Sequence, residues 1–370
     1  MKKVSAGQAQ RVLELARALQ QIPSPTFHED HKAAFVHRHF QGNGLSALDI
    51  DGAGNVLACL PGERADSPLV FSAHLDTVFP ENFPLSLALN PASASGPGIG
   101  DNSLGLAALI FLPELIRSLK IRLRHSIWLA ATTGEEGLGD LKGIRAVVDR
   151  FGSGPNAYIS LEGMGLGDVL HRGLGVERYR ITAAGPGGHS WVDYGAPSAI
   201  HELLRMGARM SALALPANPR TTFNIGVIQG GTSINAIASG AWMEIDLRSE
   251  SPLALADLSA RIRGLVEEPH PDGVHFQMDQ IGLRPAGEIP PGHPLVVAAL
   301  KTLKELGIQA HLDIASTEAN YPLSRGFPAL TIGLTSGSHA HSAQETIDVP
   351  PIRRGLQQIA GLIENIWKGE

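Results

Sequence analysis

The sequence is poor in cysteine, with Cys59 as the single one among 370 residues. One cysteine excludes an intramolecular disulfide framework, and it excludes zinc or iron–sulfur sites built from several cysteines. The sequence also lacks a run of about 20 apolar residues, and residues 1–21 do not follow the basic, apolar and small-residue order of a signal peptide. These absences predict a cytoplasmic protein without a membrane partner.

Strong positive charge is absent as well, because 30 lysines and arginines stand against 36 aspartates and glutamates. The net charge of −6 gives no indication of a nucleic-acid partner. Hydrophobic residues make up 43% of the chain and charged residues 18%, which suffices for a large core and argues against disorder. At roughly 150 residues per domain, the length suggests about two domains.

Short apolar segments alternate with helical ones in the first half of the chain. Residues 69–73, 127–131 and 157–161 are apolar runs, and each is followed by a polar or glycine-rich loop. A helical segment at 104–119 lies between the first two runs. This alternation predicts an α/β domain with a mostly parallel sheet and helices on both faces, in which functional groups lie beyond the carboxyl ends of the strands.

The pattern changes near Glu177. From there the sequence predicts, in order, strand 178–183, helix 197–213, strands 222–228 and 241–247, helix 253–266 and strand 274–281. This β-α-β-β-α-β order is that of a ferredoxin-like sandwich. Because the α/β pattern returns after Pro290, we expect an α/β domain in two parts, 1–177 and 289–370, with residues 178–288 inserted between them.

Histidines and acidic residues follow the expected strands. His74 comes directly after the first apolar run and Asp76 stands two residues later, a spacing that lets a carboxylate orient a metal-binding imidazole. His28–Asp30 and His311–Asp313 share this spacing, but the first is more typical of a solvated helix face and the second of a structural strand. Asp101 follows in a glycine-rich loop, where a helix cap is the alternative interpretation.

Three later loops carry similar residues. Glu135 and Glu136 stand between glycines, Glu162 follows the third apolar run, and His341 comes after the last expected strand. Paired glutamates are usually part of a solvated surface, but flanking glycines at the exit of a parallel strand favour a functional role. Because the carboxyl ends of parallel strands meet at one edge of a sheet, all five loops should converge there.

Taken together and in this order, five motifs resemble those of the M20 family of co-catalytic di-zinc exopeptidases and deacylases. The motifs are His74-Leu-Asp76-Thr, Gly100-Asp101-Asn102, Gly134-Glu135-Glu136-Gly, Glu162-Gly and His341-Ser-x-x-Glu345. Each motif is weak alone, whereas the set covers nearly the whole chain. The resemblance implies a zinc-exopeptidase-like catalytic domain, with residues 178–288 as its lid or dimerisation domain.

The resemblance also implies a set of metal ligands. His74, Asp101 and Glu162 would bind one zinc ion, and Asp101 would bridge to a second zinc ion held by Glu136 and His341. The positive charge of two zinc ions exceeds the negative charge of the three ligand carboxylates by one, so a bridging hydroxide completes neutrality. Manganese or cobalt are possible substitutes, because carboxylate-rich sites discriminate poorly among divalent metals.

Catalytic roles are implied in the same way. Asp76 would orient His74. Glu135, which stands beside a ligand but is not one, would act as general base on a zinc-bridging water whose pKa the metals lower to about 7.

Two departures from the family pattern leave questions open. His339 lies two residues before His341, so an exchange of ligands is conceivable, although the motif through Glu345 fits only when it is counted from His341. The segment Thr317–Asn320 has Glu318 where the family pattern has aspartate, and we assign it no role.

The inserted segment carries a second group of residues. The loop around His189 resembles the lid histidine loop of the family, which stabilises the tetrahedral oxyanion from across a subunit boundary. Asn235 and Arg248 resemble positions that bind the substrate carboxylate, a task that suits the planar guanidinium of arginine. The resemblance thus favours a homodimer formed through the lid domain, and action of His189 within its own chain after lid closure is the alternative. Without it, His189 is explained as a loop-capping histidine and Arg248 as a surface cation.

Two other enzyme classes lack their motifs. A serine hydrolase would need Gly-x-Ser-x-Gly after a strand, and the nearest segment, Gly333–Gly337, has Thr335 at the nucleophile position. A Rossmann dehydrogenase would need Gly-x-Gly-x-x-Gly, and the glycines of Gly96–Gly100 miss that spacing.

The expected function is therefore hydrolysis of an amide bond in a small peptide that bears a free carboxylate. The loop around His189 and the run Ala73–Pro80 resemble the peptidases of the family. Glu162 resembles the corresponding ligand of its deacylases, so deacylation of N-acyl amino acids is the alternative. A non-catalytic metal-binding or scaffold protein is the alternative from another class, and a non-ligand base at Glu135 argues against it.

Overall fold

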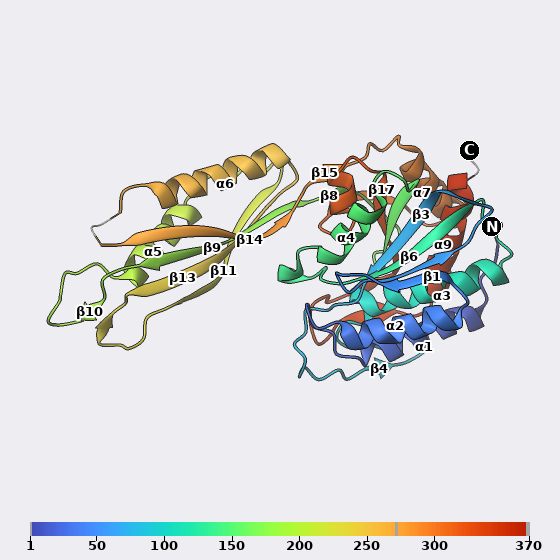
Figure 1. Cartoon of the computed structure of the whole chain (residues 1–370), viewed down its shortest axis with the longest axis horizontal. Coiled ribbons are helices and arrows are strands. Elements are labelled where there is room, and N and C mark those ends of the chain that lie inside the picture. Colours follow the sequence, from blue (N-terminus) through green and yellow to red (C-terminus); the bar gives the residue numbers. More distant parts are fainter. Residues whose placement is uncertain (1, 271–272, 368–370) are drawn as a thin grey trace. The chain divides into compact units, whose positions relative to one another are not determined.

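The computed structural model describes residues 2–270 and 273–367, which form two compact units (Figure 1). One unit comprises the chain up to Gly173 together with the chain from Gly287 onward, and the other comprises Leu174–Ala286. Each unit has its own hydrophobic core. We call them the catalytic domain and the inserted domain.

A nine-stranded sheet forms the centre of the catalytic domain. Its strands, in spatial order, are β1 (Ser46–Ile50), β2 (Val56–Leu60), β6 (His125–Thr132), β3 (Arg64–His74), β7 (Ala157–Met164), β17 (Ala329–Thr335), β8 (Asp168–Gly173) and β15 (Gly287–Glu288), with β16 (His311–Ala315) also paired to β8. The middle strands β6, β3, β7 and β17 are parallel to their neighbours within this group, whereas β1, β2 and β15 pair antiparallel. The carboxyl ends of the four middle strands therefore lie at one edge.

Helices cover this sheet. α1 (Ala6–Gln20), α3 (Gly105–Ser118), α7 (Pro294–Glu305) and α9 (Ile352–Trp367) contact one another in one layer, with α2 (Asp30–Gly42) against α3. α4 (Lys142–Phe151) and α8 (Asn320–Ser324) contact each other and the sheet. The residues of β3 from Leu69 to His74 are all buried, as expected for a parallel strand covered on both sides.

Local sequence explains where the covering helices begin and how they face the core. Ser5 and Gln8 form a capping box at the start of α1, in which each side chain accepts a hydrogen bond from the other residue's backbone N–H.

The apolar stretch Ile99–Ser118, which includes α3, is long enough to cross a membrane. However, 89% of its most apolar window of 18 residues is buried inside the domain, which is typical of a core helix.

Two short helical turns and a small sheet complete the catalytic domain near the carboxyl edge. The turns are η1 (Ile99–Leu104) and η2 (Gly137–Gly139), and the sheet is formed by β18 (Gly337–Ser338), β19 (Thr346–Asp348), β5 (Ser93–Ser95) and β4 (Ala88–Leu89). The backbone of Gly96 donates to the carbonyl of Glu345, so this sheet ties the loop after β17 to the loop before η1.

The inserted domain is a four-stranded antiparallel sheet with two helices. Its elements are β9 (Gly175–Ala184), α5 (Ala199–Ser211), β11 (Thr221–Gly230), β13 (Gly240–Ser249), α6 (Pro252–Glu267) and β14 (His275–Arg284), with the short pair β10 (Gly188–His189) and β12 (Ala236–Ile237). The spatial order β11-β13-β9-β14 is that of a ferredoxin-like sandwich. Burial alternates along β13, because only one face of the sheet packs on the helices. The predicted fold class is confirmed.

Candidate metal centre

Acidic and histidine side chains gather at the carboxyl edge of the central sheet. His74 is the last residue of β3, the Glu135–Glu136 pair follows β6, and Glu162 lies near the end of β7. β3 pairs in parallel with both β6 and β7, so these three positions are neighbours. Asp101 comes from η1 on the side of the sheet that α3 covers.

Two groups of possible ligands share Asp101. His74 Nε2 lies 3.0 Å from Asp101 Oδ1 and 3.8 Å from Glu162 Oε2. His341 Nε2 lies 3.0 Å from Asp101 Oδ2 and 3.3 Å from Glu136 Oε1. Within each group the ligand atoms lie within 4.8 Å of one another. The two oxygens of one carboxylate thus face two separate groups, an arrangement suited to bridging a pair of cations.

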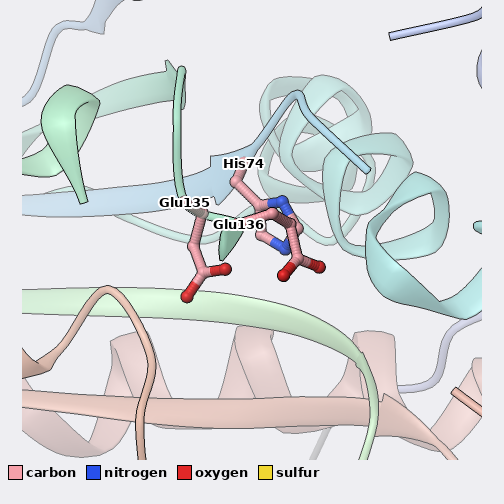
Figure 2. A group of neighbouring side chains, drawn as sticks. All are labelled: His74, Glu135 and Glu136. Carbon is pink, nitrogen blue, oxygen red and sulfur yellow. The ribbon is translucent and has the colours of Figure 1, made fainter. Parts of the chain in front are cut away.

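Glu135 lies beside these groups. Its carboxylate forms a third cluster with His74 and Glu136, again with ligand atoms within 4.8 Å. Figure 2 shows the three side chains projecting to the same side, His74 from the end of β3 and the glutamates from the loop after β6. Glu135 is 7% exposed, so the cluster is largely shielded from solvent.

Negative charge dominates the centre and raises the proton affinity of its histidines. Hydrogen bonding to Asp101, and then to Glu136, raises the pKa of His341 to about 10. Burial alone would lower the pKa of His74, but hydrogen bonds to Asp101 and Asp76 raise it well above its ordinary value. Burial and the neighbouring Asp101 charge raise the pKa of Glu162. Three carboxylates and two imidazoles in this arrangement fit divalent cations, which would take the place of the bound protons.

Asp76 contacts two parts of the centre, the loop that carries Glu135 and Glu136 and the ring of His74. Its carboxylate is fully buried and accepts hydrogen bonds from Glu135 N at 3.0 Å, Glu136 N at 2.8 Å and Thr26 Oγ1 at 2.9 Å. His74 Nδ1 lies 3.4 Å from Asp76 Oδ1 but 3.0 Å from the Asp76 backbone oxygen. The backbone carbonyl therefore contributes to the orientation of the ring, a contact that spacing alone did not indicate.

Glu345 anchors the loop that carries Asp101. It is fully buried and accepts hydrogen bonds from Gly100 N at 2.6 Å and Asp101 N at 2.8 Å. Burial raises the pKa of Glu345 to about 7 despite these donors. Both ends of the His341-Ser-x-x-Glu345 motif therefore contact Asp101. The imidazole of His341 contacts the Asp101 carboxylate, and the Glu345 carboxylate accepts a hydrogen bond from the Asp101 backbone N–H.

Glu318, to which the sequence analysis assigns no role, is buried beside the strands that lead to the centre. It is 1% exposed and accepts hydrogen bonds from Ser72 Oγ at 2.8 Å, Ser160 Oγ at 3.2 Å and the hydroxyl of Thr132. These three hydroxyls belong to β3, β7 and β6, the strands that lead to the histidine and glutamates above. Burial raises the pKa of Glu318. One carboxylate thus links three neighbouring strand ends.

His339 takes no part in the clusters formed by the described residues. Its Nδ1 lies 2.9 Å from Ser338 Oγ, whereas His341 faces Asp101 and Glu136. The structure therefore places His341 rather than His339 among the possible ligands.

Comparison with known proteins identifies the two domains. Residues 172–274 match the family model of the M20 peptidase dimerisation domain, and residues 55–170 match that of peptidase family M28. The second match spans His74, Asp101, Glu135, Glu136 and Glu162. The match of the inserted domain, together with the solved structures described below, supports an M20 metallopeptidase.

Similarity to individual known proteins extends over most of the chain. An uncharacterised protein of Bacillus subtilis, YqjE, is 25% identical over 97% of this chain and 99% of its own. Acetylornithine deacetylase of Proteus mirabilis is 27% identical over 86% of this chain and 84% of its own. A tripeptidase from Staphylococcus aureus has the same fold, with a TM-score of 0.80, 19% identity, and coverage of 97% and 99%. So does YxeP of Bacillus subtilis, described as a dinuclear metal-binding M20 peptidase, with a TM-score of 0.69, 17% identity, and coverage of 97% and 98%.

The M20 dimerisation domain carries the remaining predicted residues at its two ends. His189 in β10 pairs with Ala236 in β12, and Ser190 N donates to the Asn235 carbonyl at 3.0 Å, so His189 and Asn235 lie next to each other. The His189 Nδ1 accepts from Trp191 N at 3.2 Å, which is the capping role that the alternative interpretation gave it.

Arg248 lies in the four-stranded sheet, near the end of β13. It pairs with Val176, close to the point where the chain enters the inserted domain, and its Nε donates to Asp246 Oδ1 at 2.7 Å. Gly240, at the other end of β13, lies eight residues away, which is about 26 Å at a rise of about 3.3 Å per residue. The structure therefore brings His189 and Asn235 together but separates them from Arg248 within one domain.

Proposed function

We propose that this M20 metallohydrolase is an exopeptidase that binds two divalent cations and cleaves an amide bond in a small peptide bearing a free carboxylate. The observation that supports it most strongly is the sharing of Asp101 between two histidine–carboxylate groups, with Glu135 beside both. We assign the first cation to His74, Asp101 and Glu162, and the second to Asp101, Glu136 and His341.

Two bound cations, zinc with manganese or cobalt as substitutes, would polarise the scissile carbonyl and lower the pKa of the attacking water to about 7. The protein supplies the proton transfers. Glu135 is held next to the ligands by the hydrogen bond from its backbone to Asp76, and its carboxylate takes a proton from the water and delivers it to the leaving nitrogen.

The lid residues support a homodimeric enzyme. A side chain reaches only a few ångströms from its backbone, so the two ends of β13, about 26 Å apart, cannot contact one small substrate within the same domain. In our proposal His189 and Asn235 act on the substrate bound by a second chain, while Arg248 binds the substrate carboxylate through its guanidinium. The match to a peptidase dimerisation domain agrees with this assembly.

Paired variants test the roles of base and ligand. We expect Glu135→Gln to retain both metal ions while kcat falls by about 10²–10⁴-fold, which is the usual contribution of a general base. We expect His341→Ala to lose occupancy at one metal position. Metal content by elemental analysis and hydrolysis rates check both variants, with His339→Ala as the matched control that retains metal. If Glu135→Gln loses metal and His341→Ala does not, the assignment is wrong.

N-acyl amino acid deacylation is the second candidate, and Glu162 favours it. Glutamate at this ligand position resembles the deacylases of the family, and acetylornithine deacetylase of Proteus mirabilis is among the relatives. A panel of di- and tripeptides, N-acetyl and N-succinyl amino acids, each with a free and a blocked carboxylate, separates the two activities. Hydrolysis of acylated amino acids alone would replace our first proposal with the second.

A further inference from the structure

The backbone of the loop that carries the proposed general base donates hydrogen bonds to two buried carboxylates. Gly134 N donates to Glu29 Oε1 at 3.0 Å, Glu135 N to Asp76 Oδ1 at 3.0 Å, and Glu136 N to Asp76 Oδ2 at 2.8 Å. Three consecutive backbone amides are thus held by two side chains from distant parts of the chain. Hydrogen bonds to ionised acceptors are about twice as strong as neutral ones, so this loop is tightly fixed.

Glu29 connects the start of α2 to the glutamate loop. The same Oε1 atom accepts from Phe27 N at 3.0 Å, so the segment before α2 and the loop after β6 share one acceptor. Glu29 is 6% exposed although its sequence neighbours His28 and Asp30 are exposed. Burial raises the pKa of Glu29, and the charge of Asp76 adds to this effect.

Lys32 supplies the positive charge in this region. It follows Glu29 by three residues on α2, which places the two side chains on the same side of the helix. Lys32 is 1% exposed and one of the largest fully buried side chains of the chain. Burial lowers its pKa to about 8, and the carboxylates of Asp76, Glu29 and Asp101 oppose that effect. The pKa falls despite these three carboxylates, so the cost of burying the ammonium group exceeds its attraction to them, while the attraction offsets part of the repulsion among the carboxylates.

We propose that Glu29 and Lys32 are positioning residues for the Glu135 loop, in which Glu29 fixes the loop backbone and Lys32 balances the charge of Glu29 and Asp76. This inference rests on the proposed function, because Glu135 is the base in that proposal. A base must be held to within a fraction of an ångström of its working position, and a misplacement of about 1 Å can cost about 10²-fold in rate.

Backbone hydrogen exchange tests the inference without metal or substrate. In the chelator-treated protein, we expect Glu29→Ala to increase the exchange rate of the Gly134 amide at least tenfold and Glu29→Gln to increase it less, because the amide oxygen of glutamine can still accept. The amide of Phe71, in the middle of β3, should not change. Asp30→Asn, an exposed neighbour on α2, is the matched control. Equal increases at Gly134 and Phe71 would indicate a general loss of stability and overturn the positioning role.

Kinetics test the charge balance. We expect Glu29→Ala to lower kcat about 10²-fold with KM and metal content unchanged, and Glu29→Gln to recover part of the loss. Lys32→Met should also lower kcat, and the Glu29→Gln/Lys32→Met double variant should lose less than the product of the two single losses, because neither charge is then left unbalanced. Multiplicative losses would overturn the role of Lys32.

The two proposals fail in different ways. A wild-type protein that hydrolyses neither peptides nor N-acyl amino acids would refute the proposed function, while the exchange experiment would still decide whether Glu29 fixes the loop. An active wild-type protein in which Glu29→Ala leaves Gly134 exchange unchanged would refute only the positioning role.

Discussion

Replacing Lys32 with methionine should make the metal-free protein more stable at pH 7 and less active when metal is restored. Methionine fills a similar volume without a charge, so the substitution removes the desolvation cost of a buried ammonium group. The pKa of Lys32 is lowered from its ordinary value of 10.5 to about 8, chiefly by burial. At about 1.4 kcal/mol per pKa unit, this difference corresponds to about 3 kcal/mol.

The sign of the effect follows from proton linkage. Between pH 8 and 10.5 the unfolded chain keeps its proton on Lys32 while the folded chain loses it, so the unfolded state binds more protons there. The stability of the wild-type protein should therefore rise through this pH range, and that of Lys32→Met should lack this contribution. The advantage of the variant should be about 3 kcal/mol at pH 7 and should vanish near pH 10.5.

Urea denaturation in the presence of a chelator, from pH 6 to 10.5, measures this difference. Lys304→Met, which removes an exposed lysine from α7, is the matched control and should change the free energy of unfolding by no more than about 0.5 kcal/mol. NMR of ¹³C-labelled lysines provides an independent check, because the Lys32 resonance should titrate near pH 8. A variant that is less stable than the wild type at pH 7, or a difference that does not depend on pH, would refute the reasoning.

Three further outcomes are expected. Arg248→Lys should raise KM about tenfold or more for substrates with a free carboxylate and leave carboxyl-blocked substrates unaffected, because lysine cannot form the bidentate contact; equal effects on both would exclude carboxylate binding. Mixing the inactive variants Glu135→Gln and His189→Ala should restore about a quarter of the wild-type activity once subunits exchange, since half of the dimers then contain one complete site; an active monomer in sedimentation would contradict this. In the metal-free protein, the pKa of Glu345 near 7 lies above its ordinary value, so its contribution to stability is present below pH 4.5 and lost as pH rises through about 7. Glu345→Gln should therefore raise the urea midpoint at pH 8 but not at pH 4.5, and an equal change at both would contradict the assignment.

Strand-end motifs made the proposed ligands predictable from the sequence. His74 and Glu162 are fixed by β3 and β7, whose parallel pairing places their ends side by side. An apolar run followed by a polar loop reveals such a position without knowledge of the tertiary structure. The inserted domain was predictable for a similar reason, because the alternation of buried and exposed residues along strands such as β13 is visible in the sequence.

Contacts between distant segments were not predictable in this way. The spacing of His28 and Asp30 is typical of a solvated helix face, and both residues are exposed. Glu29 nevertheless accepts a hydrogen bond from Gly134, 105 residues away, where the start of α2 meets the loop after β6. Nothing in the local pattern distinguishes a glutamate that turns inward from its outward neighbours.

The buried carboxylates around the centre share one arrangement, in which each accepts hydrogen bonds from a nearby loop or strand. Glu29 and Asp76 accept from the Glu135 loop, Glu345 from the loop of Asp101, and Glu318 from three strand ends. Each therefore holds a piece of backbone or strand that carries a proposed ligand, and each adds negative charge to a region that already contains the ligand carboxylates. Lys32 balances part of this charge, and the rest falls to the protons on His74 and His341 or to bound cations. The carboxylates that fix the geometry of the site would thus also favour the cations of the proposed function, and we expect metal binding to contribute directly to the stability of the catalytic domain.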